Sequence, residues 1–398
     1  MKPTVLVTDG EQRASLAIVR SLGAAGHRVY VAARRTPCLA GSSRWASDVA
    51  VTPDPLDDPV GHDETLARRV KAWGVDVLVP VTDAAWLSIQ EGRTCGSGVV
   101  VPGPEPDAFR RVSDKVALLD RADAIGIATP ERVLLTGPEP DEAEVEGLEF
   151  PAVVKPARSV HRTDSGRARK LSVRHVTDPG DLCEALDRLP REAYPVMLQR
   201  RISGPGIGVF LLLWKDTCLA RFAHRRIREK PPSGGVSVNR ESIPLEPALF
   251  EKSLELLRHH DWQGVAMVEY KVDGATGVPV LMEVNGRFWG SLQLAIDAGV
   301  DFPRLLVEAA TGGRPAPVME YRTGIRSRWF WGEVDHLIAR LRTRGTTAGG
   351  GPTQAKDGRL GAVAAFLAAR PGRDRAEILR MSDPRPFLRE TLDWWRGR

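Results

Sequence analysis

The chain has 398 residues, of which 42% are hydrophobic and 27% are charged. This balance is typical of a globular protein that is large enough for two or three domains. No apolar run approaches the roughly 20 residues that cross a bilayer, and the start of the chain predicts a strand and turn instead of a signal peptide. The four scattered cysteines form no C-x-x-C pair. We therefore expect a cytoplasmic protein with reduced thiols.

The first 112 residues alternate predicted strands and helices. Apolar positions at helical spacing that end at Gly26 predict the first helix, and short apolar runs predict the strands. This alternation is typical of a Rossmann-like α/β domain with a parallel sheet. Its first turn, residues 8–15, lacks G-x-G-x-x-G, which disfavours a dinucleotide site and a nicotinamide oxidoreductase. The predicted strands are 4–8, 28–33, 75–80 and 99–101, and the predicted helices are 11–25, 63–73 and 83–91.

Residues 113–195 form a second predicted unit. A helix runs to about Ile125, and a turn over 126–130 leads into a strand. An acidic stretch rich in proline and glycine, 137–147, predicts a surface loop. Beyond it we expect a buried strand (151–156) that contains Lys155, a polar and basic hairpin or loop (159–170), a strand (171–175) and a helix (178–188) capped near Asp178.

Residues 196–319 form a third predicted unit. It begins with a strand over 196–199 and a glycine-rich turn over 202–208. It ends with two short apolar runs that are interrupted by acids, 265–270 and 281–287, and with a helix after Ser291. Between them we expect strands over 209–214 and 219–224, a loop over 225–239 and a helix over 247–259.

The last two strands carry the strongest chemical signal. Glu269 lies in the first, and Glu283, Asn285 and Arg287 occupy alternate positions of the second, so these three share one face. Two carboxylates and an amide oxygen are ligands suited to Mg²⁺, and an arginine beside them suits a phosphate or a developing anion. A lone acid in an apolar strand is otherwise an edge residue or half of an ion pair. Because two carboxylates are costly to bury without a cation or donors, the combination favours a site for a nucleoside triphosphate and a metal.

Five separate elements occur in the order found in the ATP-grasp superfamily: Lys115, Lys155, the strand at 196–199 and the two acidic strands. Over about residues 1–315 the chain resembles in particular the branch of the carbamoyl phosphate synthase large subunit and the biotin carboxylases. The resemblance implies an α/β fold that is α+β in its catalytic part. Its expected parts are a Rossmann-like pre-ATP-grasp domain (1–112), the small lobe (113–195) and large lobe (196–319) of the ATP-grasp fold, and a small basic C-terminal extension (320–398).

The resemblance implies that Lys115 and Lys155 hold the phosphates of ATP, and that Gln199, Arg200 and Ile202 hold its adenine. Lysines can follow phosphate oxygens as point charges. Backbone groups of Arg200 and Ile202 would pair with the base edge, and the Gln199 amide oxygen could accept from the exocyclic amine. Many members have glutamate where Gln199 stands, so this side chain departs from the family pattern. For Lys115 the alternative is a solvated helix residue.

The resemblance also assigns the metal ligands. Glu269, Glu283 and Asn285 correspond to the family's ligands for Mg²⁺ (or Mn²⁺), and Arg287 would stabilise the γ-phosphate or an acyl-phosphate oxyanion. The basic stretch 157–170 would be a lid over the phosphates that uses charge in place of backbone amides; an ordinary solvated loop is the alternative. Its basic residues are Arg158, Arg162, Arg167, Arg169 and Lys170.

The basic stretch 224–235 resembles the family loop that holds the carboxylate or acyl phosphate. Arg225 is the preferred contact and Arg226 the alternate, and a solvated charge run is the competing interpretation. The glycines at 234 and 235 would supply flexible backbone close to an anion.

The implied reaction is ATP-dependent joining of a small-molecule carboxylate to an amine. The carboxylate attacks the γ-phosphate, ADP leaves, and the amine displaces phosphate from the acyl phosphate. Phosphorylation of bicarbonate, as in the carboxylase and synthase relatives, is one alternative, and an ATP-binding module without turnover is another. Relatives suggest a homodimer.

The extension after residue 319 is basic, with 16 Lys/Arg against 9 Asp/Glu. No nucleic-acid motif accompanies this charge, so we expect no nucleic-acid partner. Apolar positions at helical spacing between 330 and 341 predict a helix packed on the preceding domain, with an anionic membrane surface as the alternative. We expect a glycine-rich linker over 345–361, a short helix over 360–369, and an anchor or partner contact at Trp394 and Trp395.

Overall fold

The N-terminal domain is built on a four-stranded parallel sheet of order β3-β2-β1-β4. The structure is a computed structural model that describes residues 2–139, 149–158, 160–162, 168–171, 173–232, 234–342, 358–368 and 372–397. The predicted α/β domain is confirmed, although β3 was not predicted and the expected strand at 99–101 is a single bridge between Val77 and Val100. The elements are β1 (Val5–Val7), α1 (Arg13–Ala24), β2 (Val29–Ala33), β3 (Ala46–Val51), α2 (Pro59–Trp73), β4 (Val77–Val79) and α3 (Asp83–Gln90).

Two helices, α4 (Pro106–Ser113) and α5 (Lys115–Ala124), lead into the small lobe. This lobe is an antiparallel sheet of order β5-β10-β6-β9 with α7 packed beside β9. As predicted, Asp178 caps α7, and its Oδ1 accepts from the N–H of Asp181 at 2.9 Å. The elements of the lobe are β5 (Arg132–Leu135), β6 (Ala152–Pro156), β9 (Arg174–Val176), α7 (Pro179–Asp187) and β10 (Val196–Arg200), with a separate hairpin of β7 (Val160–Arg162) and β8 (Ala168–Lys170).

The large lobe is a seven-stranded sheet of order β15-β14-β11-β12-β13-β16-β17. The prediction of a loop over 225–239 is wrong, because β12 continues to Lys230 and pairs antiparallel with β13. The charges that suggested a loop are neutralised by tertiary partners, for example Arg228 by Glu333 and Lys230 by Asp335. The strands are β11 (Gly206–Trp214), β12 (Thr217–Lys230), β13 (Val236–Ser242), β14 (Gly264–Val272), β15 (Pro279–Asn285), β16 (Arg326–Arg328) and β17 (Asp374–Ala376).

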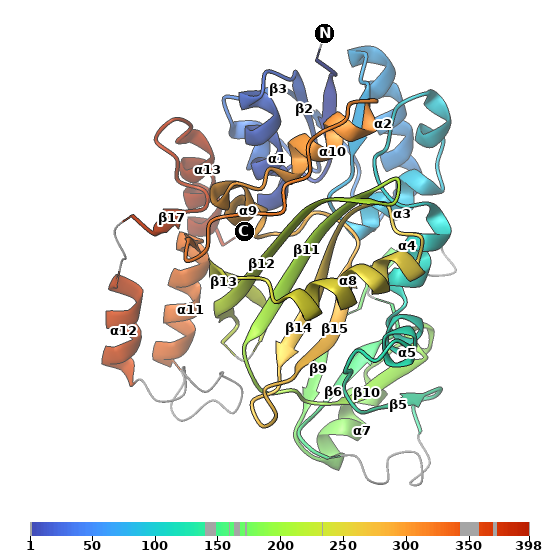
Figure 1. The fold of residues 1–398 in the computed structure, drawn as a ribbon, viewed down its shortest axis with the longest axis vertical. Helices are drawn as coiled ribbons and strands as arrows, with labels where there is room; N and C mark the ends of the chain where they lie inside the picture. Colours follow the sequence, from blue (N-terminus) through green and yellow to red (C-terminus); the bar gives the residue numbers. More distant parts are fainter. Residues whose placement is uncertain are drawn as a thin grey trace.

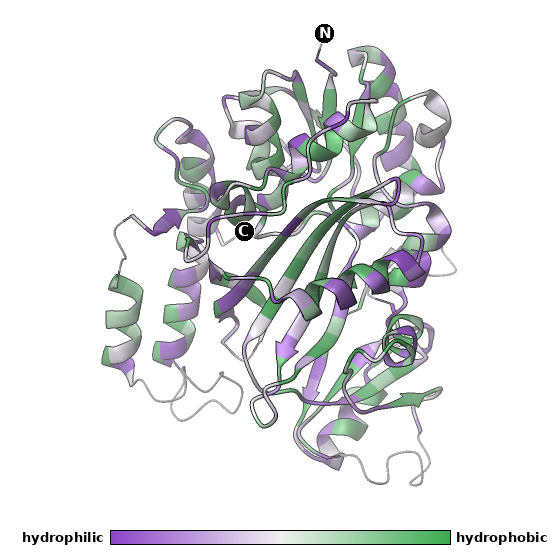
Figure 2. Ribbon diagram, in the orientation of Figure 1, coloured by the Kyte–Doolittle hydropathy of each residue, from purple (hydrophilic) through white to green (hydrophobic). Residues whose placement is uncertain are grey.

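The two faces of this sheet enter two different cores, since side chains alternate along a strand. Val209 and Val268 pack with α4, α5 and α8 (Pro247–His259), whereas Phe210 and Met267 pack with α1, α9 (Leu292–Ala298) and α10 (Phe302–Ala310). Figure 1 shows the large sheet between the N-terminal domain and the small lobe. In Figure 2 the middle of its strands is hydrophobic, and hydrophilic residues gather toward the small lobe. The sheet therefore carries its polar groups where the two lobes meet.

The C-terminal residues join the large sheet and cover part of it. Strands β16 and β17 extend the sheet, and α11 (Phe330–Arg342) packs against β12 and β13, where the sequence predicted a packed helix. The expected helix at 360–369 corresponds to α12 (Arg359–Leu367), and most of the expected linker lies outside the described residues. Helix α13 (Arg385–Trp395) follows, and its Trp394 stacks on Trp331 with ring centroids 4.0 Å apart.

Buried ion pairs connect this C-terminal segment to the rest of the chain. Glu377 contacts both Arg13 of α1, at 2.8 Å, and Arg240 of β13. Asp383 accepts from Arg20 of α1 at 2.9 Å. The segment after β17 therefore lies between the N-terminal domain and the large sheet.

None of the described helices is both long and apolar enough to span a membrane. Cys38, Cys183 and Cys218 are free thiols, as predicted, and the side chain of Cys95 lies outside the described part.

Candidate functional site

The two acids predicted to bind metal face one another across adjacent strands. Glu269 on β14 is the register partner of Glu283 on β15, and Asn285 follows two positions later, opposite Met267. Side chains two positions apart in a strand point to the same face. The structure therefore brings the three predicted ligands together on one face of the large sheet.

Hydrogen bonds connect these ligands to Arg287. Asn285 Nδ2 donates to Glu283 Oε1 at 3.1 Å, and Arg287 Nη2 donates to Asn285 Oδ1 at 3.1 Å. Arg287 Nε also donates to Oδ2 of Asp83, at the start of α3, at 3.3 Å. Arg287 thus joins the acid pair to the N-terminal domain.

Lys115 and Lys155 are buried close to the same acids. Burial raises the pKa of Glu283, but Lys115, Lys155 and the hydrogen bond from Asn285 lower it by more than burial raises it. The pKa of Glu283 therefore lies below its usual value. Burial lowers the pKa of Lys155, and the charges of Glu283 and Glu269 oppose this shift. Both predicted phosphate-binding lysines therefore lie within electrostatic reach of the acid pair.

Arg226 and Arg225 lie on opposite faces of β12. Arg226 Nη2 is 2.5 Å from Glu269 Oε2, and its Nη1 donates to Glu229 Oε1 at 3.0 Å. Arg225, the contact preferred from the sequence, instead pairs with Glu241 at 2.7 Å. The structure therefore places the alternate residue, Arg226, beside the acid pair, and places Arg225 away from it.

Each of the two acids has one oxygen that no described group engages. In the part of the chain that the structure describes, Glu269 Oε1 and Glu283 Oε2 have no hydrogen-bond partner. Burial raises the pKa of Glu269, Arg226 lowers it and the charge of Glu283 raises it, with a net upward shift. A cation between the acids would relieve this repulsion. Two carboxylate oxygens and the amide oxygen of Asn285 are a donor set that fits a hard divalent cation such as Mg²⁺.

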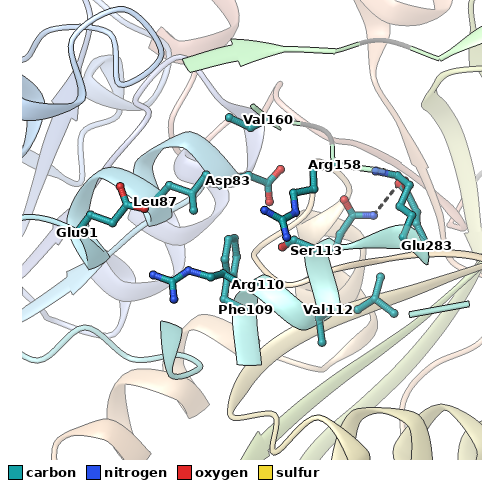
Figure 3. A pocket seen from close by; sticks show the side chains of 13 residues that line it. Asp83, Leu87, Glu91, Phe109, Arg110, Val112, Ser113, Arg158, Val160 and Glu283 are labelled. Carbon is teal, nitrogen blue, oxygen red and sulfur yellow. Dashed lines mark hydrogen bonds between the residues drawn. The ribbon is translucent and has the colours of Figure 1, made fainter. Parts of the chain in front are cut away.

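A cavity of about 250 Å³ opens beside this set (Figure 3). Lys115, Glu283, Asp83 and Arg158 are among the residues that line it. Arg158, which belongs to the predicted lid, contacts Asp114 at 3.3 Å. Of the other predicted lid residues, Arg169 is exposed, and the side chains of Arg162, Arg167 and Lys170 lie outside the described part.

The predicted adenine hinge holds two groups without hydrogen bonds. Gln199 is buried and its Oε1 accepts from no described residue, and the N–H of Ile202 likewise donates to none. The N–H of Arg200 donates to the carbonyl of Glu131 at 2.9 Å, so it is not available to a base. A buried acceptor without a donor costs free energy. Gln199 therefore fits a ligand that presents an amine, as adenine does.

Two further side chains lie on the face of the large sheet that carries Glu269, and the sequence did not predict them as site residues. Lys271, two positions after Glu269, donates to the carbonyl of Ile202 at 3.3 Å, and burial lowers its pKa. His224 shares the register partner Gly208 with Glu269, and its ring nitrogens have no partner among the described residues. Burial holds the pKa of His224 well below its usual value, so the ring is neutral. The two-residue period from Glu269 was a signal that could have found Lys271.

A second cavity of about 240 Å³ lies between the N-terminal domain and the large lobe. Arg287 and Asp83 line it, and Asp83 also lines the cavity beside the acid pair. Its charged lining is mainly acidic, with Asp9, Glu11, Asp54 and Asp83 against Arg34 and Arg287.

Comparisons of sequence find similarity over the middle of the chain. A family model described as "ATP-grasp in the biosynthetic pathway with Ter operon" matches residues 192–332. Pyruvate carboxylase 1 of Caenorhabditis elegans is 25% identical over 232 residues, which make up 54% of this chain and 19% of that protein. The chain thus spans about a fifth of the length of this curated relative.

Solved structures resemble the chain over most of its length. Biotin carboxylase from Campylobacter jejuni, solved as a β-γ-ATP complex, has a TM-score of 0.64 at 14% identity and covers 82% of this chain and 74% of its own. The biotin carboxylase domain of 2-oxoglutarate carboxylase from Hydrogenobacter thermophilus, solved with MgADP, ADP and bicarbonate, has a TM-score of 0.61 at 15% identity and covers 82% and 74%. L-amino acid ligase from Bacillus licheniformis has a TM-score of 0.60 at 17% identity and covers 82% and 79%. At these identities the likeness is one of fold.

Proposed function

We propose that this chain, which has the ATP-grasp fold, is an Mg²⁺-dependent ligase that uses ATP to join a carboxylate to an amine and releases ADP. The observation that carries the proposal is the facing pair of Glu269 and Glu283, each with an open oxygen, beside the buried Lys115 and Lys155. If the acids and lysines had only a structural role, we would expect the lysines to form ion pairs with these carboxylate oxygens. Acids and lysines held apart in one cleft suit a cation and the phosphates that it neutralises.

The residues of the site would divide between nucleotide binding and charge stabilisation. Lys115 and Lys155 would bind phosphate oxygens, and Gln199 and Ile202 would bind the base. The metal, when bound, supplies neutralisation of phosphate charge. Its proposed ligands are Glu269, Glu283 and Asn285, whose oxygens would also accept Mn²⁺.

Arg226 and Arg287 would stabilise the negative charge that develops in the reaction. The carboxylate oxygen bonds to the γ-phosphorus, the bond to ADP breaks and ADP leaves with its electron pair; the amine then displaces phosphate. We propose Arg226 in place of Arg225 as the contact for the acyl group, because Arg226 shares a face with Glu269. Positioning and fixed charges supply most of the acceleration in such transfers, so little general-base catalysis is needed. The bound amine releases its proton to water, its lone pair bonds to the acyl carbon, and phosphate leaves with its electron pair.

The acidic cavity beyond Arg287 supports a cationic amine as the second substrate. Asp83 lies between this cavity and the acid pair, because it lines both cavities and bonds to Arg287 at 3.3 Å. An amine bound there would approach the acyl phosphate from the side of the N-terminal domain. Amine substrates that carry no negatively charged group are therefore expected to react best.

Two alternatives use the same site. Bicarbonate could take the place of the carboxylate, and a module without turnover could bind ATP. The second is disfavoured by the gathering of the three candidate metal ligands with Arg226 and Arg287 on one side of the large sheet, and by the buried Lys115 and Lys155 close to them.

Incubation of the purified chain with ATP, Mg²⁺ and pools of carboxylates and amines tests the proposal. We expect ADP release that requires both pools, and a product whose mass equals the two substrates minus water. ADP release with bicarbonate alone would favour the carboxyl-phosphorylating alternative. Failure of any pool to release ADP, together with failure of ATP to bind in the presence of Mg²⁺, would overturn it.

A cytosolic location and a homodimer are also proposals. Analytical ultracentrifugation over a range of concentrations tests the second.

A further inference from the structure

A third cavity lies along β12, and Arg225 and Arg226, which point to opposite faces of this strand, both line it. It measures about 600 Å³, a size that is usual for small-molecule sites, and residues of β11, β12, β16, α11 and α12 line it. The register partners Ile207 and Arg225 line it. Glu269 pairs in register with Gly208, one position along β11, and points to the other face. The cavity is therefore distinct from the candidate nucleotide site.

Two arginines of this cavity share one buried acid. Glu241 accepts from Arg225 Nη2 at 2.7 Å and from Arg326 Nε at 3.3 Å. Both arginines hold the pKa of Glu241 below its usual value in spite of burial, so the cluster keeps a net positive charge. In the described structure, Arg225 Nη1 and both Nη atoms of Arg326 make no hydrogen bond. The free Nη edge of Arg326 offers two parallel donors, the geometry that binds a carboxylate.

A second pair of arginines fixes the wall of the cavity. Arg228 and Arg328 both contact Glu333. They also donate to the carbonyls of Ala365, at 2.7 Å, and Phe366, at 2.6 Å, at the end of α12. The C-terminal carbonyls of a helix carry partial negative charge. Because α12 has no buried residue of its own, these bonds hold it over the cavity.

Half-buried apolar side chains form the rest of the lining. Three isoleucines of the sheet meet a leucine of α11 and a phenylalanine of α12, so the cavity joins a cationic end to an apolar body. Covering such surface is favourable by about 25 cal/mol per Å². The side chains are Ile207, Ile227, Ile243, Leu337 and Phe366.

We propose that this cavity binds an organic carboxylate with an apolar body, at a site that adjoins the candidate acyl contact Arg226 but shares no lining residue with the cavity beside the acid pair. The carboxylate would bond to the Nη edge of Arg326 and to Arg225, and the apolar body would cover the isoleucines. Arg226 also lines the cavity and pairs with Glu269. The bound carboxylate would thus lie one side chain away from the candidate metal site. The proposal concerns binding and does not depend on the proposed reaction.

Isothermal titration calorimetry with 4-phenylbutyrate as the probe tests this site on the full chain, with and without excess MgADP. We expect saturable one-to-one binding in both conditions, and no binding of the neutral analogue 4-phenylbutyramide. Arg326→Gln should weaken the binding at least tenfold. The matched control Arg304→Gln, which changes an exposed arginine of α10, and Glu283→Gln at the acid pair should each change Kd less than twofold.

Ala362→Trp gives a second test that removes no charge. Ala362 is a half-buried residue of α12 that lines the cavity, so a tryptophan there should fill it and abolish binding while the circular dichroism spectrum is unchanged. Equal binding by the wild type and both cavity variants would overturn the proposal. Equal binding of the acid and the amide, loss of binding in Glu283→Gln, or no saturable binding to the wild type would overturn it as well.

Discussion

Glu283→Gln should stop ADP formation and leave the fold intact. Glutamine has nearly the same shape, and its oxygen can still accept the hydrogen bond that Asn285 donates to Glu283 at 3.1 Å. The substitution removes one negative charge beside Lys115 and Lys155. Loss of one preorganised group of this kind costs about 3–4 kcal/mol in the transition state, which is roughly 10²–10³-fold in kcat.

The effect of this variant on stability should be smaller and should depend on pH. Lys155 can release its proton when Glu283 is neutral, because burial already lowers the pKa of this lysine, so we expect a loss of about 1–3 kcal/mol. The folded pKa of Glu283 lies below its ordinary value of 4.5. Its stabilisation is therefore complete above that pH and is lost as the pH falls through the folded pKa. Urea unfolding at several pH values should show the two proteins converging in acid.

ADP release at saturating ATP and Mg²⁺ provides the assay. Glu251→Gln is the matched control, because Glu251 is an exposed residue of α8 and its loss should leave kcat unchanged. A kcat for Glu283→Gln within tenfold of the wild type would refute the assignment. An equal loss in the Glu251 variant would show that the effect is not specific to the acid pair.

Three other predictions address the base, the acyl group and the C-terminal segment. Gln199→Leu removes a buried side-chain acceptor of the hinge that no described residue engages, so the Kd of ATP measured by calorimetry should rise about fivefold, equivalent to about 1 kcal/mol; an unchanged Kd would reject the hinge assignment. Arg226→Gln should lower kcat about 10²-fold or more, whereas Arg225→Gln should stay within about threefold; the opposite order in steady-state assays would restore the preference for Arg225. Burial raises the pKa of Glu390 to about 7, although Trp329 donates to it at 2.6 Å. As the pH rises from about 4.5 through 7, the wild type should therefore lose about 3 kcal/mol of stability relative to Glu390→Gln; a difference in urea unfolding that is independent of pH would contradict this.

Much of the site could be predicted because its signals are local. Glu269 and Glu283 interrupt apolar runs that form β14 and β15, and the period of two fixes which neighbours share their face. The helix expected over 247–259 is α8 to the residue, since its apolar positions recur at helical spacing between Pro247 and a basic end.

The rest depends on contacts between distant parts of the chain. The sequence of β12 beyond residue 224 predicts a loop because it is rich in arginine. A strand forms there because acids of other elements, such as Glu333, neutralise these arginines. Without that strand, the alternation that separates Arg225 from Arg226 could not be applied. The contact of Arg287 with Asp83 joins residues 204 positions apart, and neither position alone suggests it.

Glu377 and Asp383 have a consequence for the order in which the protein can be completed on the ribosome. Arg13, Arg20 and Arg240 are each neutralised by a carboxylate that is synthesised much later, 364, 363 and 137 positions further along the chain. A buried guanidinium without a counterion is strongly unfavourable. The first domain can fold during translation. Its final packing against the large lobe buries these guanidinium groups, so that step must wait until the two late carboxylates have left the exit tunnel.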